Sequence, residues 1–180
     1  MPYGILEGAF NPATGLRTER ILSGNSVAVA QNPTGVGEAN GIKVEFGPAV
    51  NDANDPIQLF ADGTMKCNVD GLYDFHISLF YGRDAGSQEA ELRLRGFGVG
   101  IGQLGVTIGI TLGNAKATIP FTNSVWLNLT AGTEVYYEIM RDSSGVNAGG
   151  LRKDVVTAGT APNWIEASCT ALRIDHLVAT

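Results

Sequence analysis

Residues 69–77 read VDGLYDFHI, and this stretch decides the fold class expected of the chain. Gly71 permits a tight turn into an extended segment, because glycine has no Cβ to restrict its backbone. Tyr73 and Phe75 lie two residues apart, so on a β-strand both side chains point to one face and bury large aromatic surfaces there. Large apolar residues keep this spacing as far as residue 81. We therefore predict a long strand over 72–81 with one face in a protein core.

The chain beyond residue 41 repeats this strand pattern at short intervals. Turn-forming residues separate the runs, as Ala61-Asp62-Gly63 does in a predicted hairpin. No run has the sustained period of about 3.6 residues that a surface helix shows. Many short strands at such spacing favour a β-sandwich or a barrel. The further strands expected are 42–46, 57–60, 64–69, 89–95, 106–112, 115–121, 125–129, 134–140 and 164–174.

The composition agrees with an all-β chain and excludes several classes of partner. Only 17% of the 180 residues are charged and 24 are glycine, which disfavours long surface helices. The net charge is −6, so no nucleic-acid partner is expected, because such binding needs a basic face. The sequence contains neither an apolar run long enough to span a membrane nor a basic, apolar leader. We therefore expect no membrane partner and assembly in a cytoplasm.

Residues 1–41 differ from the remainder, because turn-forming residues interrupt them every few positions. Only 27–30 has the appearance of a short strand. The segment has few large apolar groups and cannot form a core of its own. We predict two parts, an extended, irregular N-terminal arm over 1–41 and a β-sandwich domain over 42–180. The apolar side chains expected to anchor the arm on a neighbouring molecule are Tyr3, Ile5, Leu6 and Phe10.

No motif points to catalysis, a metal ion or a cofactor. Residues 100–105 match the glycine pattern of dinucleotide sites, but a strand-like run follows them where a helix would be required. His76 and His176 are the only histidines, and neither has a partner at metal-ligand spacing. The acidic loop 51–55 keeps calcium open as an alternative. We expect a protein without enzymatic activity and without a cofactor.

The two cysteines, Cys67 and Cys169, are too few for a disulfide framework. We expect two buried free thiols. A bridge between them stays open as the alternative, because it would require their two strands to be neighbours.

The Gly71, Tyr73 and Phe75 motif resembles the globular-head jelly roll shared by complement first-component and tumour-necrosis-factor proteins. The later strand–glycine–strand run 125–135, VWLNLTAGTEV, and the final strand ending at 172–174 follow in the order of that family. The resemblance covers about residues 42–174 and implies an all-β jelly-roll sandwich that associates as a homotrimer. The chain departs from the animal proteins in having no collagen stalk and no secretion signal. Structural proteins of tailed phages share the same jelly roll, and the chain is most similar to those.

The resemblance implies a trimeric capsid decoration or cement protein, located in the virion and assembled in the host cytoplasm. Its partners would be further copies of itself and the major capsid protein or another virion protein. The alternative is a receptor-binding knob of a fibre or tail tip that recognises host surface carbohydrate, with Trp126, Tyr136 or Trp164 stacking on sugar rings. A fibre tip should follow a coiled coil or a strand shaft, and no heptad precedes residue 42.

Overall fold

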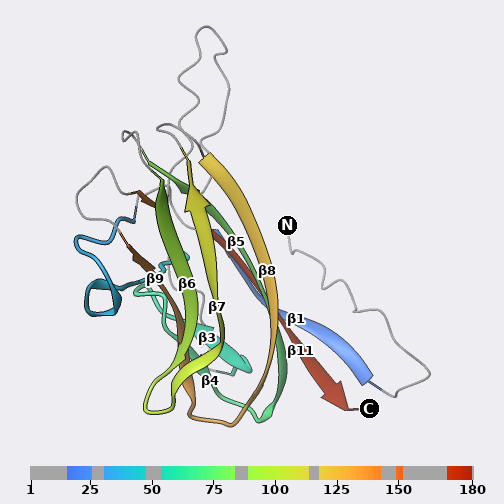
Figure 1. Cartoon of the computed structure of the whole chain (residues 1–180). Helices are drawn as coiled ribbons and strands as arrows, with labels where there is room; N and C mark the ends of the chain where they lie inside the picture. Colours follow the sequence, from blue (N-terminus) through green and yellow to red (C-terminus); the bar gives the residue numbers. More distant parts are fainter. Residues whose placement is uncertain are drawn as a thin grey trace, which may run out of the picture.

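The chain folds into two antiparallel β-sheets that face each other, as the computed structural model in Figure 1 shows. The structure describes residues 16–25, 31–47, 54–83, 89–113, 118–142, 149–151 and 170–179. Apart from the short 3-10 turn η1 (Glu38–Asn40), every regular element in these ranges is a strand. The strands are β1 (Leu16–Asn25), β2 (Ile42–Lys43), β3 (Ile57–Leu59), β4 (Met65–Cys67), β5 (Gly71–Gly82), β6 (Ala90–Gly98), β7 (Gly102–Leu112), β8 (Thr118–Leu129), β9 (Glu134–Arg141), β10 (Gly150–Leu151) and β11 (Thr170–Ala179).

The order of the strands defines a jelly roll. In sheet A the order is β1-β11-β5, with β8 on the other side of β5 and the short β10 at the end of β5. In sheet B the order is β3-β4-β9-β6-β7, and β2 pairs with β9. From β4 onward the chain passes from sheet B to sheet A between β4 and β5, between β7 and β8 and between β9 and β10, and it returns after β5 and after β8. Strands far apart in the sequence therefore become neighbours, as in double-sheet jelly rolls. The predicted fold class is confirmed.

The core lies between the sheets and is built around β5. Its residues Tyr73, Phe75, Ile77, Leu79 and Tyr81 are each no more than 1% exposed. This burial confirms the predicted face, and it follows from the period of two residues along a strand. The ring of Phe75 meets the edge of Tyr137 from sheet B at a centroid distance of 6.4 Å, so aromatic contacts tie the two sheets together.

The glycine-rich stretch between β6 and β7 is a tight hairpin. Gly98 pairs with Gly102 across the turn, and Gly100 at its tip has a φ of 74°, which glycine adopts without strain. The register shifts once, between Leu94 and Gly96, which marks a bulge in the ladder. Strand β7 follows directly, so the glycine pattern at 100–105 opens a strand, as predicted.

Several predicted strand boundaries are wrong. The runs 115–121 and 125–129 were expected as two strands, but β8 is continuous and pairs with β5 from Gly71↔Leu129 to Gly82↔Thr118. Pairing with β5 along the whole strand outweighs the turn preference of residues 122–124. Strand β2 is shorter than expected, although the N–H of Val44 still donates to the carbonyl of Tyr137 at 2.9 Å. The last strand is described from Thr170 to Ala179, and its predicted start at residue 164 lies outside the described residues.

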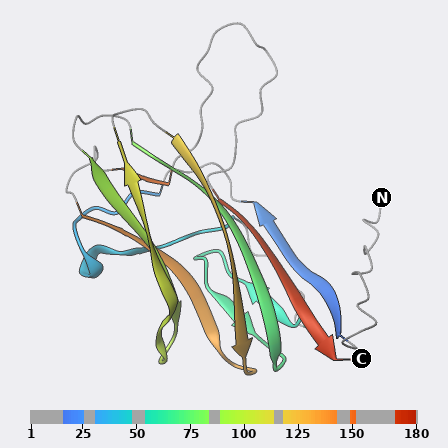
Figure 2. The ribbon, with the colours of Figure 1, turned by 45° about the vertical axis from the view of Figure 1, so that its right-hand side comes forward.

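The segment 1–41 is not irregular throughout, contrary to the prediction. Strand β1 pairs antiparallel with β11 from Leu16↔Ala179 to Asn25↔Ala171 and extends sheet A (Figures 1 and 2). Its register shifts between Arg20 and Leu22, and this bulge interrupts the alternation by which a strand is recognised in a sequence. Residues 1–15 and 26–30 lie outside the described residues, and the boundary at residue 42 stays a prediction. No helix in the described part of the chain has the length and hydropathy to cross a membrane.

Candidate functional site

The side of the sandwich formed by β7 and β8 is its most incomplete region. Among the described strands, β7 pairs only with β6 and β8 pairs only with β5. These edge strands, one from each sheet, are 11 and 12 residues long and run next to each other along one side of the molecule (Figure 1). Each presents a row of backbone N–H and C=O groups that have no ladder partner in the part of the chain that the structure describes. Long uncovered edges of this kind pair readily with another chain.

Most inward-facing side chains of the two edge strands are only half-buried, although Leu112 and Leu129 at the strand ends are buried, while those of central β5 are fully covered. They pack against the core on one side and stay accessible on the other, so the chain leaves part of its own core uncovered. Soluble proteins rarely leave a continuous apolar strip open unless something binds it. The residues that form this strip are Leu104, Ile110, Ile119, Phe121, Val125 and Leu127.

A small cavity opens between the two edge strands and reaches the core. Its volume is about 20 Å³, room for roughly one water molecule. Leu104 and Ile108 of β7 and Val125 and Leu127 of β8 line it, and Phe75 of the central strand lies at its inner end. The lining is mostly apolar, so a buried water would find few hydrogen-bond partners there. We name this region, with the half-buried strip around it, the β7–β8 edge.

The predicted motif residues Gly71, Tyr73 and Phe75 lie in the core and do not form a surface site. A Cβ on Gly71 would lie 2.3 Å from Nε2 of His176, so only glycine leaves room for that imidazole. The His176 ring stacks on Tyr73 with centroids 4.6 Å apart. The Tyr73 hydroxyl donates to the carbonyl of Val69 at 2.5 Å, and burial raises the pKa of this phenol. Tyr73 therefore serves as a protonated, buried donor that fixes the start of β5.

The other residues singled out in the sequence fall in three different settings. Tyr3, Ile5, Leu6 and Phe10 of the predicted arm and Trp164 lie outside the described residues. Trp126 lies on the outer face of sheet A and is 52% exposed. Both faces of the Tyr136 ring are taken, because Phe97 stacks on it at 5.6 Å and Nζ of Lys43 lies 4.7 Å from its centroid. Tyr136 therefore has no free face for a sugar ring, whereas Trp126 does.

A charged cluster on the outer face of sheet A was not foreseen. Asp74 of β5 and Asp175 of β11 are register partners and less than a tenth exposed. Nε2 of His76 lies 2.8 Å from a carboxylate oxygen of Asp74 and 3.7 Å from one of Asp175. Ser124 donates to Asp74 at 2.6 Å, and Arg173 lies 3.0 Å from Asp175. Opposed acids across a ladder repel each other, and the guanidinium of Arg173 offsets that repulsion.

The sequence signal for this cluster was the set of polar residues at alternate positions of 72–78, between the buried aromatic residues. The strand pairing that joins it to β11 and β8 is not local and could not be read from that segment. His76 was expected to be a hydrogen-bonded strand histidine opposite Tyr73 and Phe75, and it does lie on the opposite face. Within the described ranges, no group of three or more His, Cys, Asp or Glu side chains is arranged to hold a metal ion.

Cys67 is a free, fully buried thiol whose Sγ donates to the carbonyl of Val69 at 2.9 Å. This agrees with the expectation of a free thiol at this position. Cys169 lies outside the described residues.

The chain was compared with known protein families, curated proteins and solved structures. No protein-family model matches the chain, and no curated protein matches it. Among solved structures, the globular domain of zebrafish complement 1qA protein is similar, with 17% sequence identity and a TM-score of 0.41. The match covers 93% of this chain and 98% of that domain. This likeness concerns the course of the chain, and the jelly-roll assignment rests on the strand order itself.

Proposed function

We propose that the protein is a non-enzymatic virion structural protein, a homotrimeric decoration or cement protein of a tailed-phage head. The observation that supports the proposal is the β7–β8 edge, where two long strands and the half-buried strip between them lack a cover. Edge strands and open apolar strips are features by which subunits associate. In a trimer the edge of each copy would meet a different surface of the next copy, a head-to-tail contact that closes into a ring when the rotation between copies is 120°.

A ring of three copies would cover the edge of every subunit once. Each contact would remove the strip around Phe121, Val125 and Leu127 from water at roughly 25 cal/mol per Å² of apolar surface. Copies repeated over a capsid shell would then gain stability through many simultaneous contacts, without any single tight one. In this proposal the major capsid protein is the partner, the segment 1–41 contributes to attachment, and assembly takes place in the host cytoplasm.

The mass of the protein in solution tests the association. Sedimentation equilibrium at micromolar concentration should return three times the chain mass. Ile110→Lys places a charge in the half-buried strip and should shift the protein towards smaller species. Val36→Lys, at a residue that is 44% exposed and lies outside the edge, is the matched control and should remain trimeric. Circular dichroism and a thermal midpoint establish that both variants fold.

A stable monomer for the unaltered chain would contradict the proposal. An unchanged trimer in Ile110→Lys would show that the β7–β8 edge is not the contact. Attachment is tested separately by adding the protein to undecorated capsids and measuring occupancy. Occupancy is expected, whereas binding to host cells in its place would favour the receptor-binding knob.

A further inference from the structure

A surface hollow lies on the side of sheet B away from the β7–β8 edge. Its volume is about 480 Å³, and it is broad and open to solvent, so a ligand would lie against it without being enclosed. Lys43, Phe60, Asp62, Thr64 and Glu134 line it. They come from β2, the β3–β4 turn, the start of β4 and the start of β9. These elements belong to the half of sheet B that ends in β3, so the hollow is separate from the proposed subunit contact.

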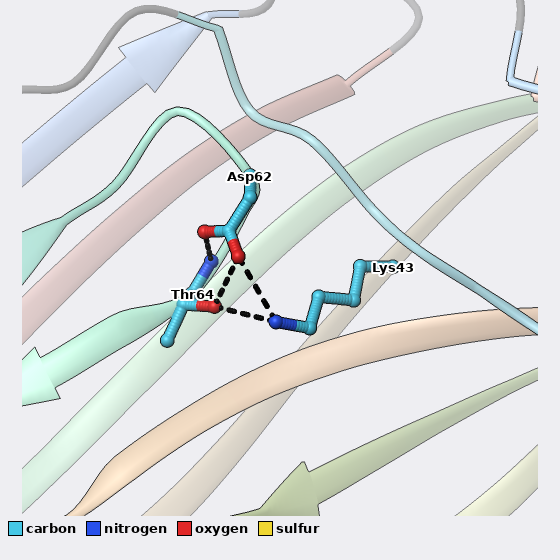
Figure 3. A network of polar contacts seen from close by, with 3 residues as sticks. All are labelled: Lys43, Asp62 and Thr64. Carbon is cyan, nitrogen blue, oxygen red and sulfur yellow. Dashed lines mark hydrogen bonds and ion pairs between the residues drawn. The ribbon is translucent and has the colours of Figure 1, made fainter.

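Three of the lining side chains hold each other in fixed positions, as Figure 3 shows. Asp62 accepts hydrogen bonds from the backbone N–H of Thr64, from the Thr64 hydroxyl and from Nζ of Lys43, each at 3.0 Å. Lys43 also donates to the Thr64 hydroxyl at 2.9 Å. These donors, with the Thr64 N–H the strongest influence, lower the pKa of Asp62. The carboxylate is therefore ionised at neutral pH and already oriented, which reduces the entropy lost on binding.

The hollow retains unused hydrogen-bonding capacity. A carboxylate has about four acceptor positions, and the bonds described occupy three on Asp62. Glu134 is half-buried, and its carboxylate makes no hydrogen bond or ion pair with any described residue. Both free acceptors call for donors on the ligand. The ammonium of Lys43 lies 3.0 Å from Asp62 and 4.7 Å from the Tyr136 ring centroid, so the lining contains both signs of charge.

Phe60 supplies the apolar part of the hollow. Its side chain is 37% exposed at the rim, although its backbone is fixed by the N–H bond to the carbonyl of Thr64 at 2.8 Å. A ligand that has several hydroxyl donors and also an apolar face satisfies both parts of the lining. A sugar ring has this combination, with hydroxyls around its rim and C–H groups on its faces.

We propose that the hollow binds a neutral pyranose sugar, with one ring face on Phe60 and hydroxyls donating to Glu134 and Asp62. Thr64 and Lys43 act as positioning residues that hold the Asp62 carboxylate. This site goes beyond the proposed structural role and does not require the trimer. It differs from the aromatic platforms expected from the sequence, because neither Tyr136 nor Trp126 takes part.

Saturation-transfer NMR on the full chain tests the site. The probes are the methyl glycosides of glucose, galactose, mannose and N-acetylglucosamine, with methyl glucuronide and glucosamine as the anionic and cationic comparisons. At least one neutral glycoside should give transfer that a titration fits to a single site. Phe60→Ala and Glu134→Ala should each weaken it by about tenfold or more, because each removes one half of the recognition.

Matched controls are Glu89→Ala and Val69→Ala, which remove an exposed acid and an exposed apolar side chain outside the hollow. Both should bind as the unaltered chain does, and all four variants should keep its thermal midpoint within a few degrees. The proposal is overturned if no neutral glycoside binds, if only a charged sugar binds, or if Phe60→Ala and Glu134→Ala bind like the controls.

Discussion

Replacing Phe75 by alanine tests the core on which the jelly roll is built. The side chain is fully buried and contacts the rings of Tyr73 and Tyr137 at centroid distances of 6.5 and 6.4 Å. The substitution removes a whole ring from a site that connects both sheets, so the loss includes the transfer free energy and the cavity left behind. Comparable changes cost about 3–5 kcal/mol of unfolding free energy. The neighbouring β7–β8 cavity shows that this part of the core does not collapse tightly, which favours the upper half of that range.

Thermal unfolding followed by circular dichroism measures the effect of Phe75→Ala. A domain of this size loses roughly 2–4 °C of midpoint per kcal/mol, so the upper half of that range predicts a decrease of about 8–20 °C. Protein concentration must be held constant, because association raises the apparent stability. Trp126→Ala is the control, since it removes an aromatic side chain that is 52% exposed and should shift the midpoint much less. Equal midpoints for Phe75→Ala and the unaltered chain would show that the register of β5 is wrong.

Two further predictions concern single contacts. Gly71→Ala should destabilise the protein and displace His176 from Tyr73, because the new Cβ would lie 2.3 Å from Nε2 of His176. Proton NMR of the imidazole reports the displacement. The control Gly113→Ala, with open space around its Cβ, should have little effect. Asp62→Asn should lower the unfolding free energy at pH 7 but not at pH 2. The lowered pKa of Asp62 stabilises the fold above the unfolded value of 3.8 and ceases to do so as the pH falls through the folded value. A difference between Asp62→Asn and the unaltered chain that stays constant from pH 7 to pH 2 would contradict this.

The parts of the fold that depend on local pattern could be predicted from the sequence. Tyr73, Phe75 and their neighbours on β5 alternate over many residues, and a period of two is a property of the strand itself. The strand that follows the glycine-rich stretch was likewise visible, because its alternation is local. The continuity of β8 was not visible, since it arises from pairing with β5 along its full length.

Non-local pairing also accounts for what the sequence did not reveal of the sites. Strand β1 forms only because β11, more than a hundred residues later, presents a matching edge. The hollow on sheet B combines Lys43, Asp62 and Glu134, which no sequence spacing relates. Their juxtaposition depends on the pairing of β2 and β4 with β9. Sequence reasoning placed stacking at Tyr136, whose ring faces are both occupied by residues of neighbouring strands.

The order of strands in sheet B relates the two proposals. The sheet ends in β7 on one side, where subunits would meet, and in the β3–β4 hairpin on the other, beside the hollow. Burial of the β7–β8 edge in a ring would leave Phe60 and Glu134 open to solvent in every copy, provided that the surface receiving the edge on the next copy is not the hollow itself. Three sugar sites on one trimer would act together on a polysaccharide, and linked weak sites exceed the affinity of one site by large factors when the spacing permits. Ile110→Lys should consequently keep the affinity for a monomeric glycoside and lose most of the avidity for a polymer of the same sugar.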